Sequence, residues 1–180
     1  AGWTWARCIA RMRETATNQD DVENLDKFIH AVIWNRELLL YTQRQYISKR
    51  FPDYDSSRRD FWAGHNRPWD FDHIFASKYI YNVKRRDKPY HNFLKQWKDT
   101  IGNLRAWPFE ENRSDHADPA SCKLATQKQM EESFLLPTEL DAFSGGYATL
   151  SDPEKALAFA QASMQRMLRI YREFLEGIRE

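Results

Sequence analysis

The sequence has few of the residues that cross-link small proteins or bind nucleotides. Its two cysteines, Cys8 and Cys122, are too few for a structural zinc site and give no disulfide framework. There is also no glycine-rich phosphate loop. We therefore expect a reduced, cytoplasmic setting and no nucleotide-hydrolysing site in this chain.

Long apolar runs are absent as well. No segment approaches the length of a transmembrane helix, and no secretory signal opens the chain. We therefore expect no membrane partner. The first residue is Ala1 rather than Met, and we expect the chain to be a piece of a longer protein or a processed product.

The composition is sufficient for a hydrophobic core. Of the 180 residues, 42% are hydrophobic and 14% are aromatic, which suits one domain over 1–180. We divide it into N-terminal helices and a loop (1–68), a central segment (69–116) and C-terminal helices (117–180).

Helical spacing of apolar residues dominates both flanks of the chain. From Val22 to Ile47 the spacing is helical, with a bend near Asn35, and Pro52 ends the helix. Near the C-terminus, Ser151 and Glu154 have the spacing of a capping box, followed by a long amphipathic run. These patterns predict a mainly α fold.

Positive charge is concentrated in one segment. The formal net charge is only +1, but residues 74–106 hold eight Lys or Arg and two acids, so the rest of the chain carries −5. Tyrosine, phenylalanine and tryptophan alternate with the charges. Such a segment attracts a nucleic-acid backbone, although a solvated surface loop has the same composition.

The central segment combines residues that could form a site for one divalent ion. Residues 71–74 predict a short strand containing Asp72 and His73, and residues 101–107 predict a second strand that starts near Asn103. A helix that begins at Pro108 carries Asn112. Carboxylate and amide oxygens suit Mg²⁺ or Mn²⁺, and histidine exchanges a proton near neutral pH.

These residues resemble a known family. The segments 66–74 (NRPWDFDHI) and 101–104 (IGNL), together with Asn112, are similar to the HNH (ββα-metal) endonuclease superfamily. In particular, they resemble the C-terminal nuclease domain of GmrSD-type restriction and phage-defence proteins. Residues 38–44 also resemble the helix that precedes the site in that family, and the likeness covers about 36–123.

The resemblance implies a fold and an activity. The fold would be mainly α with a small embedded two-stranded ββα-metal (HNH) unit. The activity would be metal-dependent DNA cleavage in a bacterial restriction or anti-phage system. In the full-length protein, an N-terminal nucleotide-hydrolysing domain would accompany this nuclease. One HNH site cuts one strand, so a double-strand break would need a dimer or two nicks.

The resemblance also implies roles for individual residues. His73 would be the general base, and Asp72 and Asn112 would hold one Mg²⁺ or Mn²⁺ ion. Asn103 would orient the His73 ring or brace the loop between the strands. His116 is an alternative ligand, since it lies four residues after Asn112 on the same helix face.

We expect DNA contacts mainly from the basic insert between the two strands. The residues expected to contact DNA are Lys84, Arg85, Arg86, Lys88, Arg105 and Arg113. Lys123 is a further candidate for a phosphate contact. Ala76 stands where many relatives have proline, which loosens the turn after the strand but removes no ligand. The insert is long, so substrate choice does not carry over from shorter relatives.

Two other functions fit the same sequence. One is a helical nucleic-acid- or partner-binding module with a vestigial metal site. The other is an RNA nuclease that uses the same residues. Loss of cleavage with retained binding in a His73→Ala variant would distinguish a nuclease from a binding module.

Overall fold

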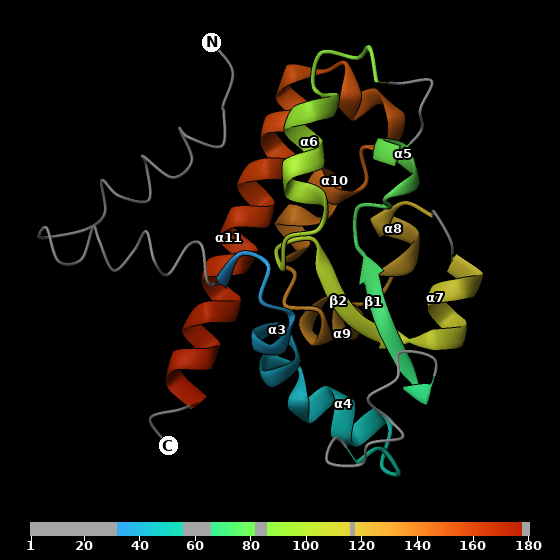
Figure 1. Cartoon of the computed structure of the whole chain (residues 1–180), viewed down its shortest axis with the longest axis vertical. Helices are drawn as coiled ribbons and strands as arrows, with labels where there is room; N and C mark the ends of the chain where they lie inside the picture. The colour runs from blue at the N-terminus through green and yellow to red at the C-terminus, as the bar shows by residue number, and fades with distance from the viewer. Residues whose placement is uncertain (1–31, 56–65, 82–85, 116–117, 178–180) are drawn as a thin grey trace, which may run out of the picture.

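The computed structural model of the chain describes residues 32–55, 66–81, 86–115 and 118–177. Figure 1 shows helices surrounding a small two-stranded sheet, so the predicted mainly α class is confirmed. The elements are α3 (Arg36–Thr42), α4 (Arg44–Arg50), β1 (Trp69–His73), α5 (Lys78–Tyr81), α6 (His91–Lys98), β2 (Leu104–Pro108), α7 (Phe109–Asp115), α8 (Ala120–Lys123), α9 (Gln127–Glu132), η4 (Pro137–Glu139), α10 (Leu140–Phe143), η5 (Gly146–Leu150) and α11 (Pro153–Gly177).

The helix predicted to run from Val22 to Ile47 is interrupted. Its part before residue 32 lies outside the described residues. The expected bend at Asn35 is a break, because Oδ1 of Asn35 accepts hydrogen bonds from the backbone of Glu37 and Leu38 and caps α3. A second break at Gln43 separates α3 from α4.

The sheet consists of two antiparallel strands, separated in the sequence by α5 and α6, with a helix beside it. Trp69 pairs with Pro108 at one end, and His73 pairs with Leu104 at the other. Helix α7 follows β2 directly and packs on both strands. Pro108 was predicted to open the helix, but it ends β2. A two-stranded sheet has only edge strands, where a residue without an N–H is tolerated.

Helix α11 runs along the molecule and supplies one wall of the core (Figure 1). Phe159, Ala160 and Ile170 of this helix are fully buried. The predicted Ser151–Glu154 capping box is wrong. Oδ1 of Asp152 caps the helix instead, accepting from the backbone N–H groups of Glu154 at 2.9 Å and Lys155 at 3.2 Å. No helix in the described ranges has the length and apolar character needed to span a bilayer.

The turn before β2 is fixed against α11. A Cβ atom on Gly102 would lie 2.3 Å from the carbonyl oxygen of Ser163, so only glycine permits this approach of loop to helix. The buried guanidinium of Arg166 donates to the carbonyl oxygens of Ile101 at 2.6 Å and Gly102 at 2.9 Å. Helix α11 therefore sets the position at which β2 begins.

Candidate active site

The register of β1 and β2 separates two neighbouring ionisable residues. Asp72 lies opposite Arg105, whereas His73 lies opposite Leu104. Successive side chains of a strand point to opposite faces, so Asp72 and His73 enter different surroundings. Asp72 is buried and the His73 side chain is about one-quarter exposed.

Asp72 is the centre of a buried cluster of charges. Its Oδ2 accepts from Nε of Arg105 at 2.8 Å, and its Oδ1 accepts from Nζ of Lys123 at 2.8 Å. All three side chains are almost inaccessible to solvent. The guanidinium of Arg105 also lies over the ring of Trp107, 3.7 Å from its centroid. Two cations around one carboxylate leave the cluster with one positive charge in excess.

Lys123 reaches β1 from α8, far along the chain. Its ammonium donates to Oδ1 of Asp72 and, at 2.9 Å, to the backbone carbonyl of His73. Both acceptors are hard oxygens. The end of β1 is thus a place where a cation is stabilised, and Lys123 supplies that cation.

His73 has a partner on the other side of the strand. Its Nε2 lies 3.0 Å from Oδ1 of Asp99, the residue directly after α6. The side chains of His73 and Asp99 are 24% and 43% exposed, so the pair lies at the edge of the core with Asp99 on its solvent side. An imidazole held by a carboxylate and open to solvent can act as a proton acceptor.

The surroundings shift both pKa values downward. Burial lowers the pKa of His73 below 6.5, against the hydrogen bond that the ring donates to Asp99, which raises it. Burial alone would raise the pKa of Asp99, but hydrogen bonds from Lys98 and His73 outweigh it and hold this pKa below 3.8. At neutral pH the arrangement is therefore a neutral imidazole beside a carboxylate.

Asp99 is itself held by a buried lysine. Nζ of Lys98 lies 2.7 Å from Oδ1 and 2.6 Å from Oδ2 of Asp99, and the Lys98 side chain is only 2% exposed. The same ammonium donates to the hydroxyl of Tyr81 and lies 3.7 Å from the centroid of its ring. These contacts join α5, the end of α6 and the end of β1.

Asn103 sets the spacing between β1 and α6. Its Oδ1 accepts from the backbone N–H of Phe75 at 2.8 Å, and its Nδ2 donates to the carbonyls of Phe75 at 3.2 Å and Lys98 at 2.9 Å. Asn103 is fully buried. Of the two roles predicted for Asn103, these contacts suit bracing of the loop between the strands.

The predicted metal ligands lie in different surroundings. Asn112 is half-buried on α7, while both carboxylate oxygens of Asp72 are paired with cations. His116 lies outside the described residues. Within the described ranges, no group of three or more His, Cys, Asp or Glu side chains could hold a metal ion.

The residues predicted to contact DNA divide into three groups. Arg86 and Arg113 are exposed and Lys88 is half-exposed, so these three can meet a ligand. Lys84 and Arg85 fall outside the described residues. Arg105 does not suit a DNA contact, because it is fully buried and paired with Asp72. Lys123 does not suit a phosphate contact, because it too is buried and paired with Asp72.

Sequence reasoning did not find Asp99 or Lys98 as site residues. They appeared only in the charge count of the basic insert. Asp99 directly follows α6 and lies 26 positions from His73, so periodicity alone does not relate the two. The adjacent acid and base at a helix end, just before the Gly-Asn-Leu segment, are the only signal in the sequence.

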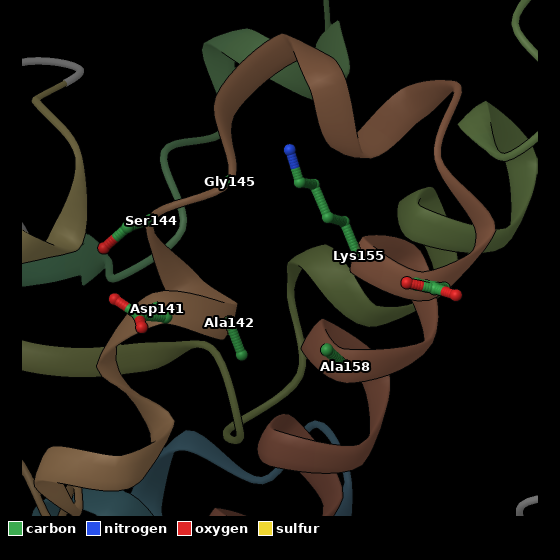
Figure 2. A pocket seen from close by; sticks show the side chains of 7 residues that line it. Asp141, Ala142, Ser144, Gly145, Lys155 and Ala158 are labelled. Carbon is green, nitrogen blue, oxygen red and sulfur yellow. The ribbon is translucent and has the colours of Figure 1, made fainter.

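A cavity of about 500 Å³ lies elsewhere, between α10 and the first turns of α11 (Figure 2). Asp141, Ser144 and Gly145 line one side, and Lys155 extends from α11 toward Gly145. Neither His73 nor Asp72 contributes to its lining. The cavity is therefore separate from the His73 cluster.

Comparisons with protein-family models, with curated proteins and with solved structures find no match to this chain.

Proposed function

We propose that this chain is a metal-dependent endonuclease that hydrolyses phosphodiester bonds of DNA, with His73 as its general base. The observation that carries the proposal is the partly exposed imidazole of His73, held at Nε2 by Asp99 at 3.0 Å. The order strand, strand and helix around it, with Asp72 on β1 and Asn112 on α7, supports the same assignment.

The reaction needs a proton acceptor and a cation. Water attacks phosphorus as one P–O bond forms and the bond to the leaving oxygen breaks. His73 takes the proton that water loses, and the leaving oxygen gains negative charge that must be stabilised. A neutral imidazole accepts this proton, and the lowered pKa of His73 keeps the ring neutral at physiological pH.

The chemistry of the oxygen donors at the end of β1 suits a Mg²⁺ or Mn²⁺ ion. Oδ1 of Asp72 and the carbonyl of His73 already bind the ammonium of Lys123, so an ion at these oxygens would have to displace it. Asp72 and Asn112 would hold the metal once Lys123 withdraws, with His116 as the alternative helix ligand. When bound, the ion supplies positive charge to the leaving oxygen.

DNA is the substrate that the exposed charge favours. Arg86, Lys88 and Arg113 offer cations at the surface of the described part, and Lys84 and Arg85 add two more in the sequence. Binding through such residues weakens steeply as salt rises. An RNA substrate is the alternative outcome of a cleavage assay.

The biological setting rests on the resemblance of the central segment alone. We place the nuclease in a bacterial restriction or anti-phage system in the cytoplasm. A nucleotide-hydrolysing domain in the N-terminal part of a longer protein would be its partner.

A binding module is the second candidate. It is favoured by the pairing of both Asp72 oxygens with Arg105 and Lys123, which is the arrangement expected of a structural ion pair. In that case the two-stranded sheet would only present a binding surface, and the metal site would be vestigial.

The test is nicking of supercoiled plasmid with Mg²⁺, with Mn²⁺ and with EDTA. We expect metal-dependent nicking by the wild type, its loss in His73→Ala, and unchanged DNA binding by fluorescence anisotropy in both. Cys122→Ser, at an exposed free thiol, is the matched control and should nick like the wild type. Metal-independent binding without any cleavage would instead support the binding module.

A further inference from the structure

The contacts from Tyr81 to His73 form one continuous chain. The Tyr81 hydroxyl binds the Lys98 ammonium, the ammonium binds both oxygens of Asp99, and Oδ1 of Asp99 binds Nε2 of His73. The chain joins three separate elements, α5, α6 and β1. Lys98 and Tyr81 have no role in the nuclease as proposed so far, and Asp99 enters it only as the group that holds Nε2 of His73.

We propose that Asp99 is a positioning residue for His73, fixing the ring with its proton on Nε2 and the lone pair of Nδ1 directed to the attacking water, while Lys98 and Tyr81 fix Asp99. The proposal rests on the proposed nuclease function and assigns it residues that the resemblance does not supply.

The tautomer follows from the donors and acceptors. An ionised carboxylate only accepts hydrogen bonds, so the nitrogen of His73 that faces Asp99 must carry a proton. In a neutral imidazole the other nitrogen, Nδ1, then has the lone pair. Without Asp99 both tautomers become accessible, and part of the population would place a proton where a base is needed.

The burial of Lys98 also supports a positioning role for Asp99. Burying an ammonium is unfavourable unless charged or polar partners replace water. Lys98 is 2% exposed, yet its ionic partner Asp99 is 43% exposed. This lysine therefore restrains a surface carboxylate that would otherwise move among rotamers, and Tyr81 occupies a remaining donor of the ammonium.

The position of Asp99 relative to His73 is set by the backbone. Asn103 binds the carbonyl of Lys98 and both backbone groups of Phe75, two residues after His73. The end of α6 and the end of β1 are thus connected through a single buried amide. The distance between Asp99 and His73 does not depend on side-chain packing alone.

Two measurements on Asp99→Ala test the proposal. The first is the ¹⁵N chemical shifts of the His73 ring in metal-free protein, which report the tautomer. We expect a single tautomer with the proton on Nε2 in the wild type and a mixture in Asp99→Ala. The second is the single-turnover nicking rate, which should fall by about 10- to 100-fold, as is usual when an outer carboxylate that orients a functional histidine is lost.

Matched variants separate positioning from general effects. Asp87→Asn removes an exposed acid from the same insert and should change neither readout. Asp99→Asn keeps an acceptor oxygen and should recover part of the rate. Tyr81→Phe keeps the ring over Lys98 but removes the hydroxyl, so a smaller loss of rate is expected than in Asp99→Ala.

The outcomes distinguish this inference from the function on which it rests. An unchanged His73 tautomer in Asp99→Ala, or an unchanged nicking rate while His73→Ala is inactive, would overturn the positioning role and leave the nuclease intact. If the tautomer changes in Asp99→Ala but the wild type never cleaves nucleic acid, the nuclease and its use of Asp99 would be overturned. Asp99 would then remain only the residue that holds the ring.

Discussion

The ammonium nitrogen of Lys123 lies 2.8 Å from Oδ1 of Asp72, in a cluster that solvent hardly reaches. This ion pair bears on two roles of Asp72, the structural one seen in the fold and the proposed one of metal ligand. With Lys123 in place both carboxylate oxygens are paired and stabilise the fold, and without Lys123 the Oδ1 atom would be available to the proposed divalent ion while Oδ2 stays paired with Arg105.

Replacing Lys123 should therefore strengthen metal binding. In Lys123→Met the Oδ1 atom of Asp72 loses its ammonium partner and the local positive charge falls by one, so we expect the Kd for Mn²⁺ to fall by about tenfold or more. Electron paramagnetic resonance of free Mn²⁺ measures this directly. The same change should destabilise the fold by about 3 kcal/mol, because a buried carboxylate loses one of two partners.

Lys128→Met is the control for this experiment. The Lys128 side chain is 74% exposed and lies 3.8 Å from Glu132 on the surface, so neither the Mn²⁺ affinity nor the stability should change appreciably. Equal Mn²⁺ affinities in Lys123→Met and the wild type, in samples shown to be folded, would exclude Asp72 as a metal ligand.

Asn103→Ala should cost about 3 kcal/mol in free energy of unfolding, measured by urea denaturation. The variant leaves the buried backbone groups of Phe75 and Lys98 without the amide that pairs with them. Asn92→Ala, at an exposed position on α6, should change stability by only a few tenths of a kcal/mol. A cost for Asn103→Ala as small as that of Asn92→Ala would contradict the bracing role.

Gly102→Ala should be strongly destabilising, because the new methyl group would lie 2.3 Å from the backbone oxygen of Ser163 and α11 would have to move. We expect a loss of about 3 kcal/mol, at the upper end of overpacking effects. In Gly177→Ala the new methyl group meets the Tyr41 hydroxyl at 3.0 Å, a side-chain end that can shift. Its cost should be clearly smaller in parallel thermal melts.

The pKa of His73 makes stability depend on pH. Since burial lowers this pKa below 6.5, the unfolded chain takes up the His73 proton at a higher pH than the folded chain does. The contribution of His73 therefore makes the free energy of unfolding fall as the pH is lowered through 6.5. Urea denaturation at about pH 7.5 and about pH 5.5, with EDTA, should show a larger fall for the wild type than for His73→Gln.

The comparison isolates His73 because the other titrating groups are common to both proteins. Asp99 does not titrate in this range, since its pKa is held below 3.8. Identical pH dependences in the two proteins would mean that His73 has the same pKa in the folded and unfolded chain.

The sequence predicted the two strands and their polar residues but not the partners of those residues. The strand that carries Asp72 and His73, and the turn at Gly102 and Asn103, are local patterns of alternation and turn chemistry, which short-range rules describe. The predicted start of β2 at Ile101 was early, because Arg166 of α11 holds the carbonyls of Ile101 and Gly102 in a turn.

The pairing of charges depends on tertiary structure. Arg105 was counted among the DNA-binding cations because it belongs to a basic segment, yet the strand register places it opposite Asp72 in the interior. Lys123 lies 51 positions from Asp72, a separation that no local pattern covers. The amino-acid sequence alone does not distinguish buried from exposed cations, and both Arg105 and Lys123 are buried.

Chemical rescue of His73→Gly by imidazole, in the plasmid-nicking assay with Mg²⁺ or Mn²⁺, is the sharpest test of His73 as the general base. If His73 is the general base, the variant should lose about 10²- to 10⁴-fold in rate, and free imidazole should restore part of it in proportion to the concentration of the neutral form. Cleavage by His73→Gly at the wild-type rate, or a loss that imidazole does not relieve in a folded variant that still binds DNA, would contradict the assignment of His73 as the base.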